Sequence, residues 1–119
     1  MEQVKLFSGM AKSFSPVTTG DTVDQLSNNI LYLDGDFTNE NLDNLVQLVR
    51  ITVENADIRY GFVTTTGEGE EPSQGSNIGH VKSEGDEIWL ESFEQAKGFR
   101  FINKVDSTNA KLQITAYYI

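Results

Sequence analysis

Apolar and polar residues alternate with a period of two in several segments of this chain. Residues 46–54 are the clearest case, because every second side chain from Val49 to Val53 is apolar and the residues between them are polar. This is the pattern of a β-strand with one buried and one solvated face. Further short strands are predicted at similar apolar or alternating runs, in residues 57–63, 87–91, 99–104 and 111–119.

Turn-forming residues separate these runs about every eight to twelve residues, a spacing typical of β-sandwiches and barrels. We therefore predict an all-β fold, an antiparallel β-sandwich or barrel of about seven to eight short strands. The runs 46–54 and 57–63 are joined only by a short polar link at Asn55-Ala56. This arrangement predicts an antiparallel hairpin between them.

The chain divides into a less regular beginning and a patterned remainder within one domain. Residues 1–28 carry no clear period and are predicted to be an N-terminal arm or edge segment, whereas residues 29–119 form the sandwich core. Pro16 lacks a backbone donor, so its segment belongs at a sheet edge or outside the ladder. Residues 64–79 are rich in Gly, Glu, Ser and Thr, which predicts a surface loop built as an extended arm or flap. A ligand or ion held by this loop is the alternative to a simple solvated surface.

Composition narrows the classes of partner. The chain of 119 residues carries 18 acidic and 9 basic side chains, a formal net charge of −9. Such a surface repels phosphate backbones and anionic lipid, so neither nucleic acid nor a membrane is an expected partner. The absence of Cys excludes disulfides and thiolate chemistry. No apolar stretch approaches the roughly 18 residues of a membrane span, and the first residues do not resemble a signal peptide.

Residues that carry catalytic or metal chemistry form no recognisable motif. His80 is the only histidine, and nothing around it resembles a nucleophile turn, so we interpret it as a polar residue at a strand start. Residues 34–38 begin like a calcium loop, but Gly35 is misplaced and the terminal bidentate Glu is missing. We therefore predict no enzyme, no catalytic residue, no cofactor and no metal site.

Apolar side chains on predicted outward positions indicate a contact face. Trp89 is predicted to point outward between the inward-facing Ile88 and Leu90. An outward Trp on a sheet serves as an interface anchor or a carbohydrate platform, or it packs under the long loop. Tyr117 and Ile119 are predicted on the outward face of the last strand. On an acidic surface these side chains are candidate interaction residues.

The strand motifs of residues 46–119 follow one another in a recognisable order. They are Ala56-Asp57-Ile58-Arg59-Tyr60, Pro72-Ser73, Gly79-His80-Val81, Glu84-Gly85-Asp86-Glu87-Ile88, Phe99-Arg100-Phe101-Ile102 and Leu112-Gln113-Ile114-Thr115-Ala116-Tyr117-Tyr118. This order resembles that of small virion structural proteins of tailed bacteriophages. The resemblance leaves residues 1–45 unmatched, and here residues 67–71 lengthen the approach to Pro72.

The resemblance implies a non-enzymatic β-sandwich that serves as a capsid decoration (cement) protein on the outer surface of a phage head. Its expected partner is the major capsid protein or another virion protein, and its expected location is the virion, assembled in the reducing host cytoplasm, where a chain without Cys fits. A trimer or ring is the expected homo-oligomer. An N-terminal arm carrying Val4, Leu6 and Phe7 would grip a neighbour by adding a strand. A tail or neck component and a carbohydrate-binding module are the alternatives.

Overall fold

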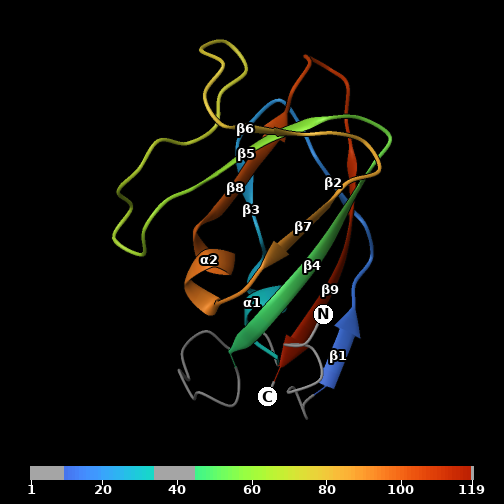
Figure 1. The fold of residues 1–119 in the computed structure, drawn as a ribbon, viewed down its shortest axis with the longest axis vertical. Helices are drawn as coiled ribbons and strands as arrows, with labels where there is room; N and C mark the ends of the chain where they lie inside the picture. Colours follow the sequence, from blue (N-terminus) through green and yellow to red (C-terminus); the bar gives the residue numbers. More distant parts are fainter. Residues whose placement is uncertain (1–9, 34–44, 119) are drawn as a thin grey trace.

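The computed structural model describes residues 10–33 and 45–118. Within these ranges the strands lie in two antiparallel sheets packed face to face, which confirms the predicted all-β sandwich (Figure 1). Two of the strands have only two residues, so their number exceeds the expected seven or eight. In chain order the elements are β1 (Met10–Ser13), β2 (Val17–Thr18), β3 (Asp24–Gln25), α1 (Asn28–Leu31), β4 (Val46–Glu54), β5 (Ile58–Phe62), β6 (His80–Lys82), β7 (Glu87–Leu90), α2 (Phe93–Gly98), β8 (Phe99–Asn103) and β9 (Lys111–Tyr118). No helix among the described residues is long and apolar enough to cross a membrane.

Sheet A has the strand order β1-β9-β4-β7, with β2 also paired to β9. Strands β1 and β2 pair with successive parts of β9, so together they form one edge of the sheet. Pro16 lies between them, at a sheet edge, as its missing backbone donor requires. The opposite edge is β7.

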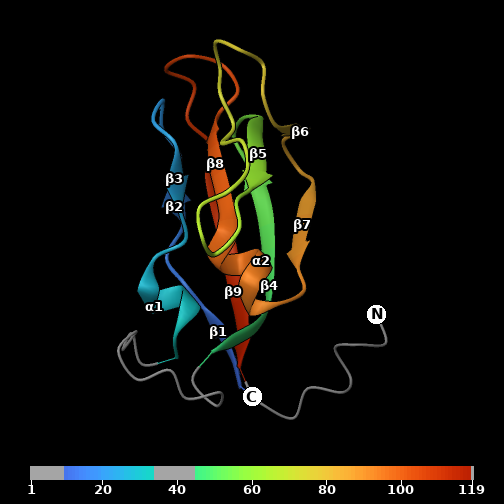
Figure 2. The ribbon, with the colours of Figure 1, turned by 90° about the vertical axis from the view of Figure 1, so that its left-hand side faces the viewer.

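Sheet B has the strand order β3-β8-β5-β6. Figure 2 shows β6 and β7 along one side of the sandwich and β2 and β3 along the other, so the edges of the two sheets coincide. The described part of the predicted N-terminal segment, residues 10–28, therefore lies at an edge of each sheet, with β1 and β2 in sheet A and β3 in sheet B.

The predicted hairpin between residues 46–54 and 57–63 is wrong. Strand β4 pairs with β7 and β9 in sheet A, whereas β5 pairs with β6 and β8 in sheet B. A two-residue type I′ turn needs a positive φ at both central residues, and only Asn55 has one, at 75°. Ala56 is instead buried, and the chain crosses from one sheet to the other. Both runs turn an apolar face toward the same core, and periodicity alone does not distinguish this crossing from a hairpin.

The core between the sheets follows the predicted alternation. All four inward positions of β9 are buried, as are Ile88 and Leu90 on β7. Phe62 is an exception, because the alternation within residues 57–63 predicts that it points inward with Ile58 and Tyr60, but it is 41% exposed. It is the last residue of β5 and lies beyond the core, beside α2. The buried members of β9 are Leu112, Ile114, Ala116 and Tyr118.

A polar cluster ties together the loops at one end of the sandwich. Thr19 and Asn103 are the buried polar residues of the described chain, and the Thr19 hydroxyl donates to Asn103 Oδ1 while accepting from the Ala110 backbone N–H at 2.8 Å. Asn103 Nδ2 donates to Asp21 Oδ1 at 3.0 Å and to Asn109 Oδ1 at 2.7 Å. Both polar atoms of the Asn103 side chain are thus satisfied, as burial requires.

Asp21 extends this cluster to the long loop. Its carboxylate accepts from Gln74 Nε2 at 2.9 Å and from the Ser107 backbone N–H at 2.9 and 3.1 Å. Hydrogen bonds from Gln74, from the Ser107 backbone and from Asn103 favour the ionised form and lower the pKa of Asp21 from 3.8 to about 2. The ionised carboxylate of Asp21 therefore connects its own loop to the loops that carry Gln74 and Ser107.

The long loop 64–79 is anchored against the outer face of sheet B. A Cβ placed on Gly61 would lie 3.6 Å from the Glu70 carbonyl oxygen, and Pro72 beside it is buried. The Arg59 guanidinium donates to the Gly79 carbonyl at 3.2 Å and to Asn77 Oδ1 at 3.2 Å. These contacts hold both halves of the loop and cover that face of the sheet.

Candidate functional site

The outer face of sheet A brings together two of the predicted interaction residues. Trp89 of β7 lies opposite Arg50 of β4, and Tyr117 of β9 lies opposite Leu48 of the same strand. Leu48 and Arg50 are two positions apart on β4 and therefore share a face of the pleat. We call this set the outer patch: Leu48, Arg50, Trp89 and Tyr117.

Leu48 reaches the outer patch because the register of β4 shifts near its start. Val46 pairs with Tyr118 on the core side, and Leu48 then pairs with Tyr117, which leaves Gln47 as an extra residue between the two pairs. Leu48 is only 3% exposed, yet it does not belong to the core cluster. The alternation within residues 46–54 predicts Leu48 on the solvated face of its strand, and Leu48 is not among the interaction residues predicted from the sequence. The available signal was a Leu on a face otherwise made of polar side chains.

Trp89 is held in place by a charged neighbour. The guanidinium carbon of Arg50 lies 5.7 Å from the centroid of the Trp89 ring, within the range of a cation–π contact. Arg50 Nε in turn donates to Glu87 Oε2 at 2.6 Å. The indole therefore has one of its faces occupied, whereas a carbohydrate platform uses an open aromatic face. Trp and Arg are both enriched among the residues that dominate protein–protein binding energies.

The strand residues of this outer face carry no net charge. Arg50 and Lys111 balance Glu54 and Glu87, in a chain whose net charge is −9. The remaining positions are neutral, and two of the polar ones satisfy one another, since the Ser13 and Thr115 hydroxyls lie 3.3 Å apart. A neutral face with half-buried aromatic side chains costs less to desolvate than the acidic remainder of the surface.

Four predicted interaction residues lie outside the described residues. These are Val4, Leu6 and Phe7 of the predicted arm and Ile119 of the predicted last strand. The acidic segment 34–38, which begins like a calcium loop, lies outside as well.

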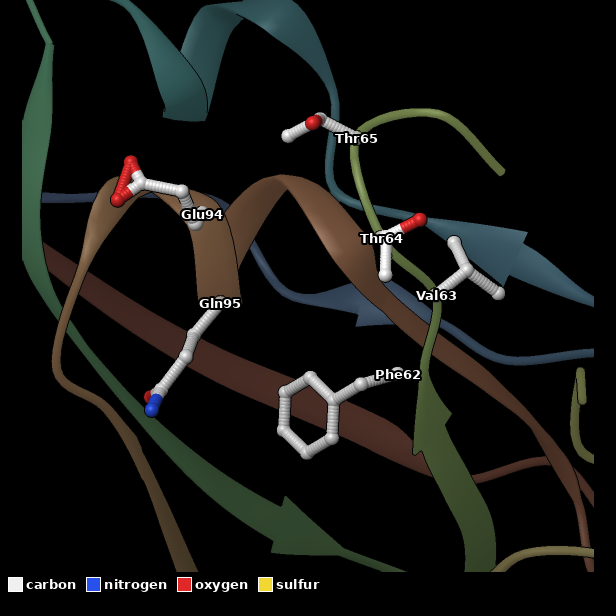
Figure 3. Close-up of a pocket in the computed structure, with 6 residues that line it drawn as sticks. All are labelled: Phe62, Val63, Thr64, Thr65, Glu94 and Gln95. Atoms are coloured by element: carbon white, nitrogen blue, oxygen red, sulfur yellow. The ribbon is translucent and has the colours of Figure 1, made fainter. Parts of the chain in front are cut away.

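A pocket of about 370 Å³ lies at the end of β5, next to α2. Figure 3 shows the Phe62 ring and the Gln95 side chain on one side of the pocket, with the Glu94 carboxylate pointing away from both. The exposed ring can receive an apolar side chain. The remaining lining residues are Val63, Thr64 and Thr65.

The remaining candidates for catalytic or metal chemistry in residues 10–33 and 45–118 are His80 and the acidic side chains. No group of three or more His, Asp or Glu side chains in these ranges could hold a metal ion. His80 lies at the start of β6, as predicted, with its ring 5.4 Å from the Tyr60 ring. The outer patch places two aromatic side chains and an arginine on one face, and these are residue types enriched among those that dominate protein–protein binding.

Comparisons with known proteins add no relative. No family model matches the chain, and a search of curated proteins finds no match. The resemblance to phage virion proteins therefore stays a prediction, together with the function, partner and location that it implies.

Proposed function

We propose that this protein is a non-enzymatic structural protein of a phage virion, a decoration protein that binds the outer surface of the head through the outer patch of sheet A. The observation that carries the contact surface is the grouping of the half-buried Trp89 and Tyr117 on either side of β4, on a face whose strand residues carry no net charge. The virion assignment rests on the order of strand motifs in residues 46–119. A tail or neck position is the runner-up and would use the same surface.

The charge distribution suits this orientation. A protein bound by its neutral face turns its acidic loops outward, away from the shell and the packaged genome that it encloses. The long loop with Glu68, Glu70 and Glu71 lies over sheet B, on the opposite side of the sandwich from the outer patch.

The carbohydrate-binding alternative is weakened by the state of Trp89. Arg50 lies over the indole and is itself paired with Glu87, so a sugar ring would have to displace a charged side chain from that face. A protein partner can instead keep the Arg50–Trp89 pair intact and pack around it.

Replacing Trp89 with Ala should weaken binding to phage heads that were assembled without this protein. The expected loss is at least about 2 kcal/mol, or roughly 30-fold in Kd, because a partly buried Trp in an interface is a typical hot spot. Co-sedimentation of the labelled protein with such heads measures the affinity. Tyr117→Ala should weaken binding in the same direction by a smaller factor.

Val81→Ala is the matched control. Val81 is 43% exposed on β6, at the edge of the other sheet, and its truncation should leave the affinity for heads unchanged. Equal binding by wild-type protein and Trp89→Ala would contradict the proposed surface. Binding to isolated tails and not to heads would favour the runner-up, and quenching of Trp89 fluorescence by soluble glycans would favour the carbohydrate-binding module.

A further inference from the structure

The free edge of sheet A has a defined hydrogen-bond register. Strand β7 is the last strand of sheet A in the part of the chain that the structure describes. Just before it, the Gly85 N–H donates to the Val53 carbonyl at 2.7 Å, and the Val53 N–H donates to the Asp86 carbonyl at 3.0 Å. Bonded and non-bonded pairs alternate along an antiparallel ladder. Ile51 and Val49 follow Val53 at every second position of β4, so they also face β7. Their pairing partners Ile88 and Leu90 therefore direct their backbone groups toward β4.

The other side of the sheet gives the same register independently. The Phe14 N–H donates to the Ile114 carbonyl at 3.1 Å, so Ile114 directs its backbone toward β1. The next residue, Thr115, must then face β4, where it pairs with Arg50. It follows that Ile51, one position along β4, faces β7.

Two residues of β7 therefore direct their backbone groups away from the sheet. These are Glu87 and Trp89, each with one N–H and one C=O. Among the described residues, no backbone hydrogen bond involves these groups. The next outward donor, the Glu91 N–H, is satisfied by Gln95 Oε1 at 2.8 Å. The open edge is thus two residues long and is closed at the end next to α2.

We infer that this edge accepts an extended, basic segment of the partner protein as an additional strand alongside Trp89. Four carboxylates lie within residues 84–91, at Glu84, Asp86, Glu87 and Glu91, and no basic residue interrupts them. Arg50 neutralises only Glu87. Every second side chain of an added strand would lie on the face that carries Glu87 and Trp89, and a Lys or Arg there meets both a carboxylate and an aromatic ring.

This inference rests on the proposed function for the identity of the partner, a virion protein, but its geometry stands on the edge alone. Strand addition supplies affinity through main-chain hydrogen bonds and specificity through alternate side chains. Short, charged edges also serve to prevent pairing between sheets. An edge that accepts a strand should bind a basic peptide, whereas an edge that serves only to prevent pairing should not.

The first test uses ¹⁵N-labelled protein and the acetylated, amidated peptide (Thr-Lys)₄ at 0.15 M salt. Bound peptide should slow hydrogen exchange of the Glu87 and Trp89 amides at least tenfold, since each N–H would gain an acceptor. The peptide (Thr-Glu)₄ is the matched control and should leave both amides unchanged. Equal exchange with and without (Thr-Lys)₄ would overturn the inference.

The second test separates backbone pairing from charge attraction. Glu87→Pro removes an outward N–H at the first residue of an edge strand, where Pro is tolerated, whereas Glu87→Ala removes the same carboxylate and keeps the N–H. Glu87→Pro should bind (Thr-Lys)₄ at least tenfold more weakly than Glu87→Ala, and equal affinities would overturn strand addition. The wild-type exchange measurement remains decisive if Glu87→Pro does not fold.

The outcomes also separate this inference from the proposed function. If the protein binds (Thr-Lys)₄ at β7 but does not bind heads, the strand-accepting edge is supported and the virion assignment is contradicted. If the protein binds heads while the β7 amides exchange as before, the proposed function is supported and the strand-accepting edge is contradicted.

Discussion

Replacing Gly98 with Ala is expected to lower the free energy of unfolding by at least about 3 kcal/mol, at the upper end of what overpacking costs. A Cβ at this position would lie 2.0 Å from the Val63 carbonyl oxygen, far inside van der Waals contact. Neither backbone is free to move, because the Val63 N–H donates to the Gly98 carbonyl at 2.9 Å and the adjacent residues Phe62 and Phe99 are paired in the β5–β8 ladder. The close approach of α2 to the end of β5 therefore requires Gly.

Gly75→Ala is the matched control for this experiment. A Cβ there would meet no atom within 4 Å, and the φ of Gly75 is not in the left-handed region. Its unfolding free energy should stay within about 1 kcal/mol of wild type, with a small gain from the stiffer unfolded chain. Urea unfolding followed by circular dichroism measures both variants. A Gly98→Ala protein as stable as Gly75→Ala would contradict the packing described between α2 and β5.

Alkaline pH is expected to destabilise the protein through Tyr118. Burial raises the pKa of Tyr118 from 10 to about 12, and its hydroxyl donates to the Ile30 carbonyl oxygen of α1. The unfolded chain releases this proton near pH 10, whereas the folded protein holds it until about pH 12. The protonated Tyr118 hydroxyl therefore contributes its full stabilisation below pH 10. The free energy of unfolding then falls by roughly 3 kcal/mol in total as the pH rises from 10 to 12.

Urea midpoints between pH 8 and 11.5 test this expectation against Tyr118→Phe. That variant should lose about 1 to 2 kcal/mol at neutral pH, because the Ile30 carbonyl is left without its donor, and it should show a flatter alkaline decline than wild type. Tyr117→Phe removes a tyrosine hydroxyl on the outer face one residue away and is the matched control for the substitution itself. Identical declines for wild type and Tyr118→Phe would show that the hydroxyl is not buried as described.

The alternation of residues in the sequence was sufficient to predict the class of fold and the two faces of the long strands. Leu112 to Tyr118 alternate as predicted, and Trp89 points outward between two buried neighbours. These predictions succeed because side chains of adjacent strand residues must point to opposite faces, whatever the strand pairs with.

Pairing partners could not be predicted in the same way. Alternation in β4 and β5 is compatible with a hairpin and equally with two strands on opposite sides of one core, and the backbone at Asn55-Ala56 selects the second. Likewise, Trp89 and Tyr117 were each predicted to face outward, but their grouping depends on β4 lying between β7 and β9. That order follows from long-range packing and is not written in any short segment.

The structural roles of polar residues were the hardest to predict from the sequence. Thr19 belongs to a segment that reads as a turn, yet it is 2% exposed and hydrogen-bonds to Asn103, which is distant in sequence. The long loop 64–79 has the composition of a solvated arm, but Pro72 is buried and Arg59 anchors its far end. In both cases specific hydrogen bonds between distant segments decide the structure, and composition does not encode them.

The most direct test of the proposed function is a cryo-electron microscopy difference map of phage heads, assembled without this protein and then incubated with it. The proposal predicts added density on the outer surface of the shell, with sheet A toward the capsid and Trp89 and Tyr117 at the contact. The loop 64–79 should point outward. No added density, or density attached through sheet B and its loop, would contradict the account.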